Sequence, residues 1–272
     1  MLKGKLHLVV TPIGNLKEIN NRAIEILQEV DVIACEDTRN SLKLLNHFDI
    51  HNKLIAYHNF NEKNSALGII ELLKEGKNIA LISDAGYPLI SDPGYELVNK
   101  VIEEGIDIDV IGGNNAGLNG LIASGLDTTH YLFYGFLNAK SSLAKKQLEE
   151  IKDFPYTIIF YEAPHRINKT LNLIYEVFGD RKACIARELS KIHEEYVRDK
   201  LSNLIKLENL KGEIVLVVQG NKQEKIIDEK LLLVNIKELV DKGMKIKDAC
   251  EVVSKDSGIT KNKLYNLYTK NK

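Results

Sequence analysis

Short apolar runs alternate with amphipathic stretches through the first half of the chain. In the amphipathic stretches apolar residues recur every three or four positions, which is typical of helices. Regular alternation of strands and helices favours a mostly parallel sheet covered by helices. The pattern therefore predicts an α/β domain over residues 1–137. Its strands are expected at 6–10, 31–35, 54–57, 78–82 and 107–111, with a sixth candidate at 131–134.

A second, smaller α/β domain with a mixed sheet is expected over residues 138–220. It begins with a helix rich in Lys and Glu over 143–151, and another helix is expected from Pro164 to Phe178. The strands of this domain are predicted at 156–161, 182–187, near Tyr196, and at 213–218.

The last fifty residues have a helical pattern. Residues 221–228 are charged and lack a clear period, so they are expected to form a linker. Three short helices are then predicted over 230–242, 245–256 and 260–269. The last two with their turn resemble a helix-turn-helix, a pattern that also serves as compact helical packing.

Composition places the chain among ordinary globular proteins. It has 272 residues, of which 44% are hydrophobic and 28% are charged. No apolar run has the length of a membrane span, and the start lacks a signal-peptide pattern, so a cytoplasmic location is expected. Cys35, Cys184 and Cys250 form no metal-spacing pair and lie in apolar contexts. They are therefore expected to be buried free thiols, and no metal site is predicted.

Charge is distributed unevenly along the chain. The net charge is −1, yet residues 229–272 hold ten Lys and six acidic residues, which leaves −5 on the remainder. A basic tail on a mildly acidic body suits an electrostatic contact with phosphate. A solvated helical surface explains the same charges.

The segment 83–94 is an unusually long turn of Ser, Asp, Gly and Pro. It follows an apolar run at 79–82 and precedes a helical pattern at 95–102. Short side chains let a ligand approach the backbone closely, and Pro88 and Pro93 restrict the shape of the loop. Ligands of α/β domains bind outside the carboxyl ends of strands. The loop is therefore a candidate binding element, although an ordinary strand–helix connection is an equal alternative.

Six segments in order carry a resemblance to a known family. Beside the 83–94 loop they are Thr11–Leu16 (TPIGNL), Glu36–Arg39 (EDTR), Phe160–Arg166 (FYEAPHR), Ala186–Glu195 (ARELSKIHEE) and Lys211–Val218 (KGEIVLVV). Together they resemble the bacterial small-subunit rRNA methyltransferase I family, from about Leu6 to Gly220 with a shorter match in the tail. That family belongs to the tetrapyrrole-methylase-like enzymes that use S-adenosylmethionine.

The resemblance implies both a fold and an activity. The fold is two α/β domains of the tetrapyrrole methylase type, with a parallel-rich first sheet, a mixed second sheet and a small helical appendage. The activity is 2′-O-methylation of a cytidine in the decoding region of 16S rRNA in the small ribosomal subunit. A homodimer is implied as well, with the cleft for the cofactor between the two domains of each subunit.

The resemblance also assigns residues to the cofactor. S-adenosylmethionine carries no phosphate, so its site needs no phosphate-binding glycine loop, and the chain has none. It needs backbone groups for the polar edges and an apolar wall for the adenine. Asp84 is as well suited to organising its own turn as to contacting the ligand. The assigned residues are Thr11, Pro12, Ile13, Ser83, Asp84, Ala85, Asn115, Ala116, Tyr161, Glu213 and Ile214.

One loop departs from the family pattern. Where the family has a Pro-Gly-Pro turn, this chain has Gly112-Gly113-Asn114-Asn115, without either proline. Proline offers neither a donor nor a charge, so no side-chain chemistry is lost. The departure is expected to affect the rigidity of the loop, and through it the affinity for the cofactor.

Methyl transfer to a hydroxyl needs an aligned oxygen and an acceptor for one proton. Glu36 and Arg39 also suit a local ion pair that caps the next helix, and His165 suits a structural role at a helix start. No single residue is assigned as the proton acceptor, and proximity alone is an alternative. The candidates for the catalytic groups are Glu36, Asp37, Arg39, His165 and Arg166.

Basic side chains are expected to meet RNA mainly through its phosphates. The expected target is single-stranded or has a splayed nucleotide, because the ribose of a duplex is hard to reach. An interdomain salt bridge is the alternative for Arg187 and Glu188. The candidates for RNA contacts are Lys43, Lys140, Lys145, Lys146, Arg187 and Lys191, together with the basic tail.

Two other functions compete with this interpretation. A methylase of the same fold acting on a ring carbon of a tetrapyrrole would have no use for a basic tail, and it would want an apolar trough. A catalytically inactive module that binds the ribosome is a competitor of a different class, and the altered 112–115 loop is its best argument.

Overall fold

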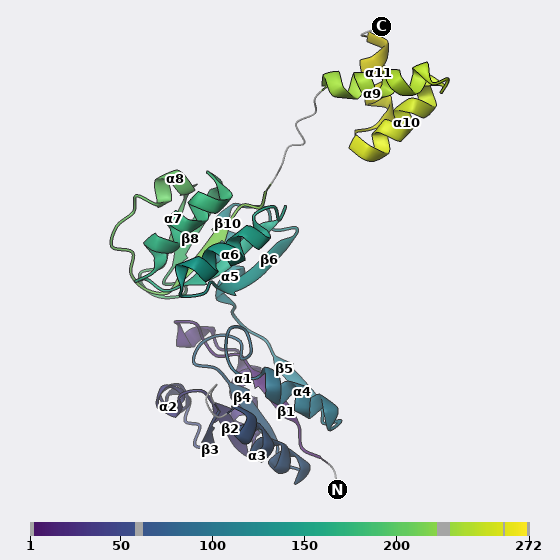
Figure 1. The fold of residues 1–272 in the computed structure, drawn as a ribbon. Coiled ribbons are helices and arrows are strands. Elements are labelled where there is room, and N and C mark those ends of the chain that lie inside the picture. The colour runs from purple at the N-terminus through teal and green to yellow at the C-terminus, as the bar shows by residue number, and fades with distance from the viewer. Residues whose placement is uncertain (1–2, 58–61, 222–228, 258, 271–272) are drawn as a thin grey trace. The chain divides into compact units, whose positions relative to one another are not determined.

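The computed structural model describes residues 3–57, 62–221, 229–257 and 259–270 (Figure 1). Its contacts divide the chain into two compact units, Met1–Asn221 and Lys222–Lys272. Apart from Asn221, the expected linker at 221–228 lies outside the described residues.

A five-stranded parallel sheet forms the first lobe of the larger unit, as the alternation of strands and helices predicts (Figure 1). Its strand order is β3-β2-β4-β1-β5. The strands are β1 (Leu6–Val9), β2 (Val32–Cys35), β3 (Lys53–Ala56), β4 (Ile79–Ile82) and β5 (Ile108–Ile111). The helical elements of this lobe are η1 (Leu16–Glu18), α1 (Asn21–Glu29), α2 (Thr38–His47), α3 (Glu62–Lys74) and α4 (Tyr95–Glu103).

Helices cover both faces of this sheet, which explains why β2 and β4 are apolar at every position. Leu6, Ile79 and Leu81 pack with residues of α3 and α4 on one face. Ile33 and Ile82 pack with residues of α1 and α2 on the other face. The carboxyl ends of β1, β2, β4 and β5 therefore open into loops at one edge of a rigid layer.

A mixed sheet of order β6-β7-β10-β8-β9 forms the second lobe, which confirms the expected mixed character. β6 runs parallel to β7, and the other neighbours are antiparallel. The strands are β6 (Tyr131–Phe136), β7 (Thr157–Glu162), β8 (Lys182–Arg187), β9 (Glu195–Lys200) and β10 (Ile214–Val218). The helices are α5 (Ala116–Ser124), α6 (Ser141–Ile151), α7 (Ile167–Phe178) and α8 (Leu201–Leu204).

The sixth candidate strand lies in this second sheet, so its placement with the first five strands is wrong. Residues 131–136 pair with β7, and α5 packs on β8 and β10. A Cβ at Gly120 of α5 would lie 2.8 Å from Val215 Cγ1, which shows how closely the helix approaches the sheet. The chain therefore crosses from the first lobe to the second at 112–115 and not after Phe136.

α6 and α7 cover one face of the second sheet, and α5 covers the other. Ile13 of the first lobe joins the second core, where it packs with Leu121 and Val215. A residue from the loop after β1 thus helps to fasten the two lobes together. α7 begins at Ile167, later than expected, because residues 163–166 form a turn in which Arg166 N–H donates to Ala163 O at 3.0 Å.

The smaller unit contains three helices, α9 (Glu229–Asp241), α10 (Ile246–Ser257) and α11 (Lys261–Lys270), in agreement with the periodicity. Leu232, Ile236, Cys250 and Leu264 are among the residues of its small core. The tail is thus a compact helical unit with a core of its own.

Cys35, Cys184 and Cys250 are free and buried, as their apolar contexts predict. Burial raises the pKa of each thiol. Within the described ranges, no helix combines the length and the hydrophobicity that crossing a bilayer requires. Over the same ranges, no group of three or more His, Cys, Asp or Glu side chains could hold a metal ion.

Candidate functional site

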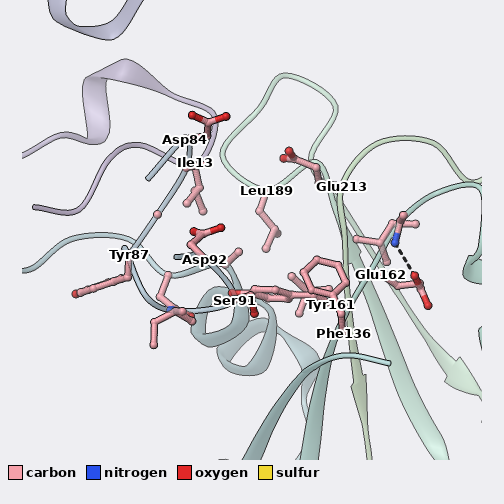
Figure 2. Close-up of a pocket in the computed structure, with 18 of the residues that line it drawn as sticks. Ile13, Asp84, Tyr87, Ser91, Asp92, Phe136, Tyr161, Glu162, Leu189 and Glu213 are labelled. Atoms are coloured by element: carbon pink, nitrogen blue, oxygen red, sulfur yellow. Dashed lines mark hydrogen bonds between the residues drawn. The ribbon is translucent and has the colours of Figure 1, made fainter. Parts of the chain in front are cut away.

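A cavity of about 350 Å³ lies where the loop edge of the first sheet meets the second lobe (Figure 2). Its volume falls in the range of roughly 300–1,000 Å³ that is usual for small-molecule sites. The first lobe and the loop between the lobes contribute Ile13, Asp84, Ala85, Gly86, Tyr87, Ile90, Ser91, Asp92 and Asn115. The second lobe contributes Ala116, Phe136, Tyr161, Glu162, Ala163, Pro164, Leu189, Glu213, Ile214 and Val215.

Most of the residues that the resemblance assigns to the cofactor line this one cavity. They come from five separate stretches of sequence, which the fold brings together at the ends of β1, β4, β5 and β7 and at the start of β10. These residues are Ile13, Asp84, Ala85, Asn115, Ala116, Tyr161, Glu213 and Ile214.

Three of the assigned residues, Thr11, Pro12 and Ser83, are not among the residues that line the cavity. Thr11 exchanges backbone hydrogen bonds of 3.0 Å with Gly86, and its hydroxyl donates to Ser83 O at 3.1 Å. The Ser83 hydroxyl donates to Gly86 O at 3.0 Å. Thr11 and Ser83 are buried, and they fasten the start of the 83–94 loop beneath the cavity.

The 83–94 loop has an uncommon backbone. Leu89 and Ser91 adopt left-handed conformations, with φ of 70° and 68°, which are uncommon for residues other than glycine and cluster at functional sites. Ser91 fits against a bulge in β6, where a Cβ at Gly135 would lie 3.3 Å from Ser91 Oγ. The loop is thus clamped between the lobes, and it presents Asp92 to the cavity.

Hydrogen bonds hold the loop that lacks the two prolines of the family pattern. The Tyr87 phenol accepts from Gly113 N–H at 3.0 Å and donates to Gly113 O at 3.3 Å. The Asn20 amide donates to Gly112 O at 2.5 Å, and the Asn114 amide donates to Glu18 at 2.5 Å. A Cβ at Gly113 would lie 2.2 Å from Val10 Cγ1, so this close approach requires glycine.

An aromatic and aliphatic wall forms one side of the cavity. Tyr161 is packed edge-on between Phe133 and Phe136, with ring centroids 5.0 and 5.6 Å from its own. Its phenolic oxygen accepts from Gly117 N–H at 3.1 Å, and burial raises its pKa, so the ring stays neutral. Leu189 and Ile214 extend the wall, which suits a flat apolar group.

Leu189 owes its position to a strained turn after β8. The flanking residues Glu188 and Ser190 have positive φ of 52° and 66°. Glu188 accepts from the Lys191 ammonium at 2.9 Å and from Glu213 N–H at 3.0 Å. Lys191 also packs on the first lobe, since a Cβ at Gly14 would lie 2.6 Å from Lys191 Cγ.

Acidic side chains lie on the polar side of the cavity (Figure 2). Burial raises the pKa of the half-buried Asp92 to about 6, and the nearby charges of Glu36 and Asp84 add to the effect. Asp84 is exposed, and its carboxylate accepts from the Asn40 amide at 3.0 Å. A cavity that concentrates negative charge favours a cationic ligand.

Arg166 and His165, two of the catalytic candidates, do not line the cavity. Arg166 pairs with buried Glu162 at 3.2 Å and donates to Leu137 O at 3.0 Å. Glu162 also accepts from the Thr170 hydroxyl at 2.5 Å. This network fixes the turn before α7. His165 lies exposed in the same turn.

The remaining candidates follow β2. Asp37 caps α2 by accepting from Arg39 N–H at 2.9 Å, and it pairs with the Arg39 guanidinium at 2.7 Å. These hydrogen bonds hold the pKa of Asp37 at about 2. The local ion pair at the helix start therefore joins Arg39 to Asp37. Glu36 is near enough to the cavity to affect Asp92, but it does not line it.

Several RNA-contact candidates already have ionic partners. Arg187 pairs with Glu195 at 2.5 Å, and Lys191 bridges Glu188 and Glu213 at 2.9 Å each. All of these partners belong to the second lobe, so the alternative that Arg187 and Glu188 form an interdomain salt bridge is wrong. Lys145 pairs with Glu176 at 2.6 Å on the surface. Lys43, Lys140 and Lys146 are exposed.

Some lining residues were absent from the sequence assignment. Tyr87, Ile90 and Asp92 belong to the loop that the sequence singles out, so its composition was a usable signal. Phe136 stands at the carboxyl end of a strand, a position that also points to a site. Leu189 depends on left-handed turns at residues other than glycine, which leave no pattern in the sequence.

Comparison with known proteins adds independent information. The family model described as Tetrapyrrole (Corrin/Porphyrin) Methylases matches residues 5–205. Ribosomal RNA small subunit methyltransferase I of Halalkalibacterium halodurans is 44% identical over 274 residues, covering 98% of this chain and 95% of that protein. The protein of the same name from Bacillus subtilis is 42% identical, covering 97% and 94%.

Solved structures show the same fold. Uroporphyrin-III-C-methyltransferase from Thermus thermophilus superposes with a TM-score of 0.58 at 19% identity, covering 80% of this chain and 94% of that one. The family match spans both lobes, and the curated relatives span nearly the whole chain. The chain belongs to the tetrapyrrole methylases and, within them, to the ribosomal RNA small subunit methyltransferase I family.

Proposed function

We propose that this enzyme uses S-adenosylmethionine to methylate the 2′-hydroxyl of a cytidine in the decoding region of 16S rRNA. Membership in the family supports methyl transfer to small-subunit rRNA. The observation that carries the proposal is the cavity between the lobes, where an apolar wall faces a group of carboxylates.

The residues of the cavity fit the cofactor group by group. Ile13, Leu189 and Ile214 offer an apolar surface for the adenine, and the exposed carboxylate of Asp84 offers negative charge to the sulfonium and the amino group. When bound, the cofactor supplies a methyl group on a positively charged sulfur, which leaves as a neutral thioether. The protein must align the acceptor oxygen and remove its proton.

Exposed cations provide contacts for the phosphates of the RNA. Lys43, Lys140 and Lys146 are exposed on the larger unit, and the tail carries the net charge of +4 that its ten Lys and six acidic residues give. The paired cations Arg187, Lys191 and Lys145 join this proposal if phosphate displaces their carboxylate partners. Contacts of this kind give affinity with little base specificity.

We also propose that the enzyme acts as a homodimer in the cytoplasm, where small subunits are assembled. Large apolar side chains at the surface of the first unit support an association, since Ile122 is 74% exposed, Tyr95 71% and Val110 58%. Light scattering of the purified protein tests this point. A mass of one chain at micromolar concentration would contradict the dimer.

The function is tested by transfer of a labelled methyl group to purified small subunits that lack the mark. We expect label in 16S rRNA, at a 2′-O-methylcytidine identified by nuclease digestion and mass spectrometry. A precorrin is the control substrate. Label in the precorrin alone would reject the proposal.

Calorimetry with the demethylated cofactor S-adenosylhomocysteine separates an enzyme from an inactive ribosome-binding module. We expect saturable binding with one ligand per chain. No heat of binding at millimolar ligand would favour the inactive module.

A further inference from the structure

Asp92 is a carboxylate without a hydrogen-bonding partner inside the cavity. It lines the cavity from the 83–94 loop and is half-buried there. Over the described ranges, no side chain or amide donates a hydrogen bond to it, and no Lys or Arg pairs with it. The cations that contact lining residues are already engaged, since Arg166 pairs with Glu162 and Lys191 pairs with Glu213.

The groups that face Asp92 are acidic or neutral. Glu36 at the end of β2 and Asp84 in the loop after β4 repel its negative charge. Tyr161 of β7 lies close enough for the Asp92 charge to act on its hydroxyl. Glu162 and Glu213 line the same cavity from the second lobe. Burial and these carboxylates together make the protonated form of Asp92 more favourable than it is in water.

The other acids of the cavity are already committed. Glu162 accepts from Arg166, Thr170 and its own neighbour Ala163. Glu213 is 75% exposed and pairs with Lys191. Asp84 is exposed and accepts from the Asn40 amide. Asp92 is left as the carboxylate that can receive a proton without breaking a bond inside the protein.

We propose that Asp92 is the catalytic residue that accepts the proton of the substrate hydroxyl, an assignment that rests on the proposed function. The hydroxyl oxygen forms the new bond to the methyl carbon, and the electron pair of the carbon–sulfur bond goes to sulfur. The proton of the hydroxyl passes to Asp92 and then to water. A pKa of about 6 suits this task, because the carboxylate is ionised at neutral pH yet more basic than an ordinary aspartate.

The test compares the full-length wild type with Asp92→Asn, using small subunits that lack the mark and saturating cofactor. Asparagine keeps the shape of the side chain but cannot accept a proton. We expect the single-turnover rate to fall about 100-fold or more, the usual contribution of general base catalysis. Affinity for S-adenosylhomocysteine should stay within about threefold of the wild-type value, as a small neutral contact implies.

The pH profile separates proton transfer from a structural role. The wild-type rate should rise with pH to a plateau, and the Asp92→Asn rate should lose this rise. Asp92→Glu, which retains a carboxylate, should recover part of the rate and the pH dependence. Asp107→Asn is the matched control, because Asp107 is exposed and outside the cavity.

Two results would overturn the assignment while leaving the proposed function intact. One is an Asp92→Asn enzyme with a rate and a pH profile like those of the wild type. The other is loss of cofactor affinity with an unchanged rate at saturation, which would make Asp92 a cofactor contact only. Absence of methyl transfer by the wild type would instead overturn the proposed function, and this inference with it.

Discussion

Hydrogen bonds from individual side chains hold the 112–115 loop in place, although it has neither proline of the family pattern. The Tyr87 phenol contacts both polar groups of Gly113, and Asn20 binds the carbonyl of Gly112. Asn115 then caps α5 by accepting from Leu118 N–H at 2.9 Å, and it also lines the cavity. The loop that motivated the idea of an inactive module is therefore held in place.

Replacing Tyr87 with Phe removes both hydrogen bonds to Gly113 while keeping the ring. Each such bond contributes about 0.5–1.5 kcal/mol, so loss of both should weaken the binding of S-adenosylhomocysteine by about 5- to 150-fold. Isothermal titration measures this change. Tyr156→Phe, a change at an exposed ring stacked on His130, is the control. Equal affinity in the two variants would show that the hydrogen bonds between Tyr87 and Gly113 are not needed for binding.

The ionised side chain of Asp92 destabilises the folded protein, and this effect can be measured apart from catalysis. Its folded-state pKa is raised from 3.8 to about 6. The carboxyl therefore contributes its full stability below about pH 3.8, and that contribution is lost as the pH rises through about 6. Asp92→Asn should be more stable than the wild type at pH 7 and equal to it near pH 4, and because solvent screens this half-exposed carboxylate the gain should be about 1 kcal/mol, well below the ~3 kcal/mol that the full shift gives. Urea titrations at the two pH values test the sign.

At the scale of elements, the sequence predicted most strands and helices to within a few residues. Buried strands such as β2 and β4 read clearly because every position is apolar. The hydrophobic pattern of a strand does not show which sheet the strand joins. For that reason the sequence placed β6 with the first sheet, although it belongs to the second. The left-handed turns at Leu89 and Glu188 gave no signal either, because tertiary contacts impose them on residues other than glycine.

The packing of α5 on the second sheet can be tested by two matched substitutions of glycine. Gly120→Ala places a Cβ 2.8 Å from Val215, so overpacking should destabilise the protein by roughly 1–3 kcal/mol. Gly68→Ala on α3 meets no atom within 4 Å and should stabilise it by about 0.5–1 kcal/mol. Thermal unfolding reports both. Changes of the same sign in both variants would contradict the close packing of α5.

At the scale of the whole molecule, the site is a product of tertiary structure. The sequence located most of its residues through motifs, but it could not show that Thr11 and Ser83 support the loop from below. It also could not show which of many acids is left without a partner. That distinction depends on ion pairs such as those of Glu162 and Glu213, whose partners are set by the fold.

The basic tail is expected to contribute to RNA affinity as a compact unit. Changing exposed Lys263 and Lys270 of α11 to Gln should weaken RNA binding and reduce the slope of log affinity against log salt by up to about 2. The same change at exposed Lys53 and Lys206 of the larger unit is the control. Filter binding across a range of salt concentrations measures the slope. An unchanged slope would show that these lysines do not contact RNA and that the tail has only a packing role.

The lobes of the larger unit are consecutive in sequence and share one covalent crossing, at 112–115. Everything else that closes the cavity is non-covalent, notably Lys191 against Gly14 and Ser91 against Gly135. A spent cofactor can therefore leave by a hinge-like parting of the two lobes in which no strand pairing breaks and Ile13 is the core residue that must withdraw from the second lobe. The rate of product exchange would then be set by the few contacts that join the lobes.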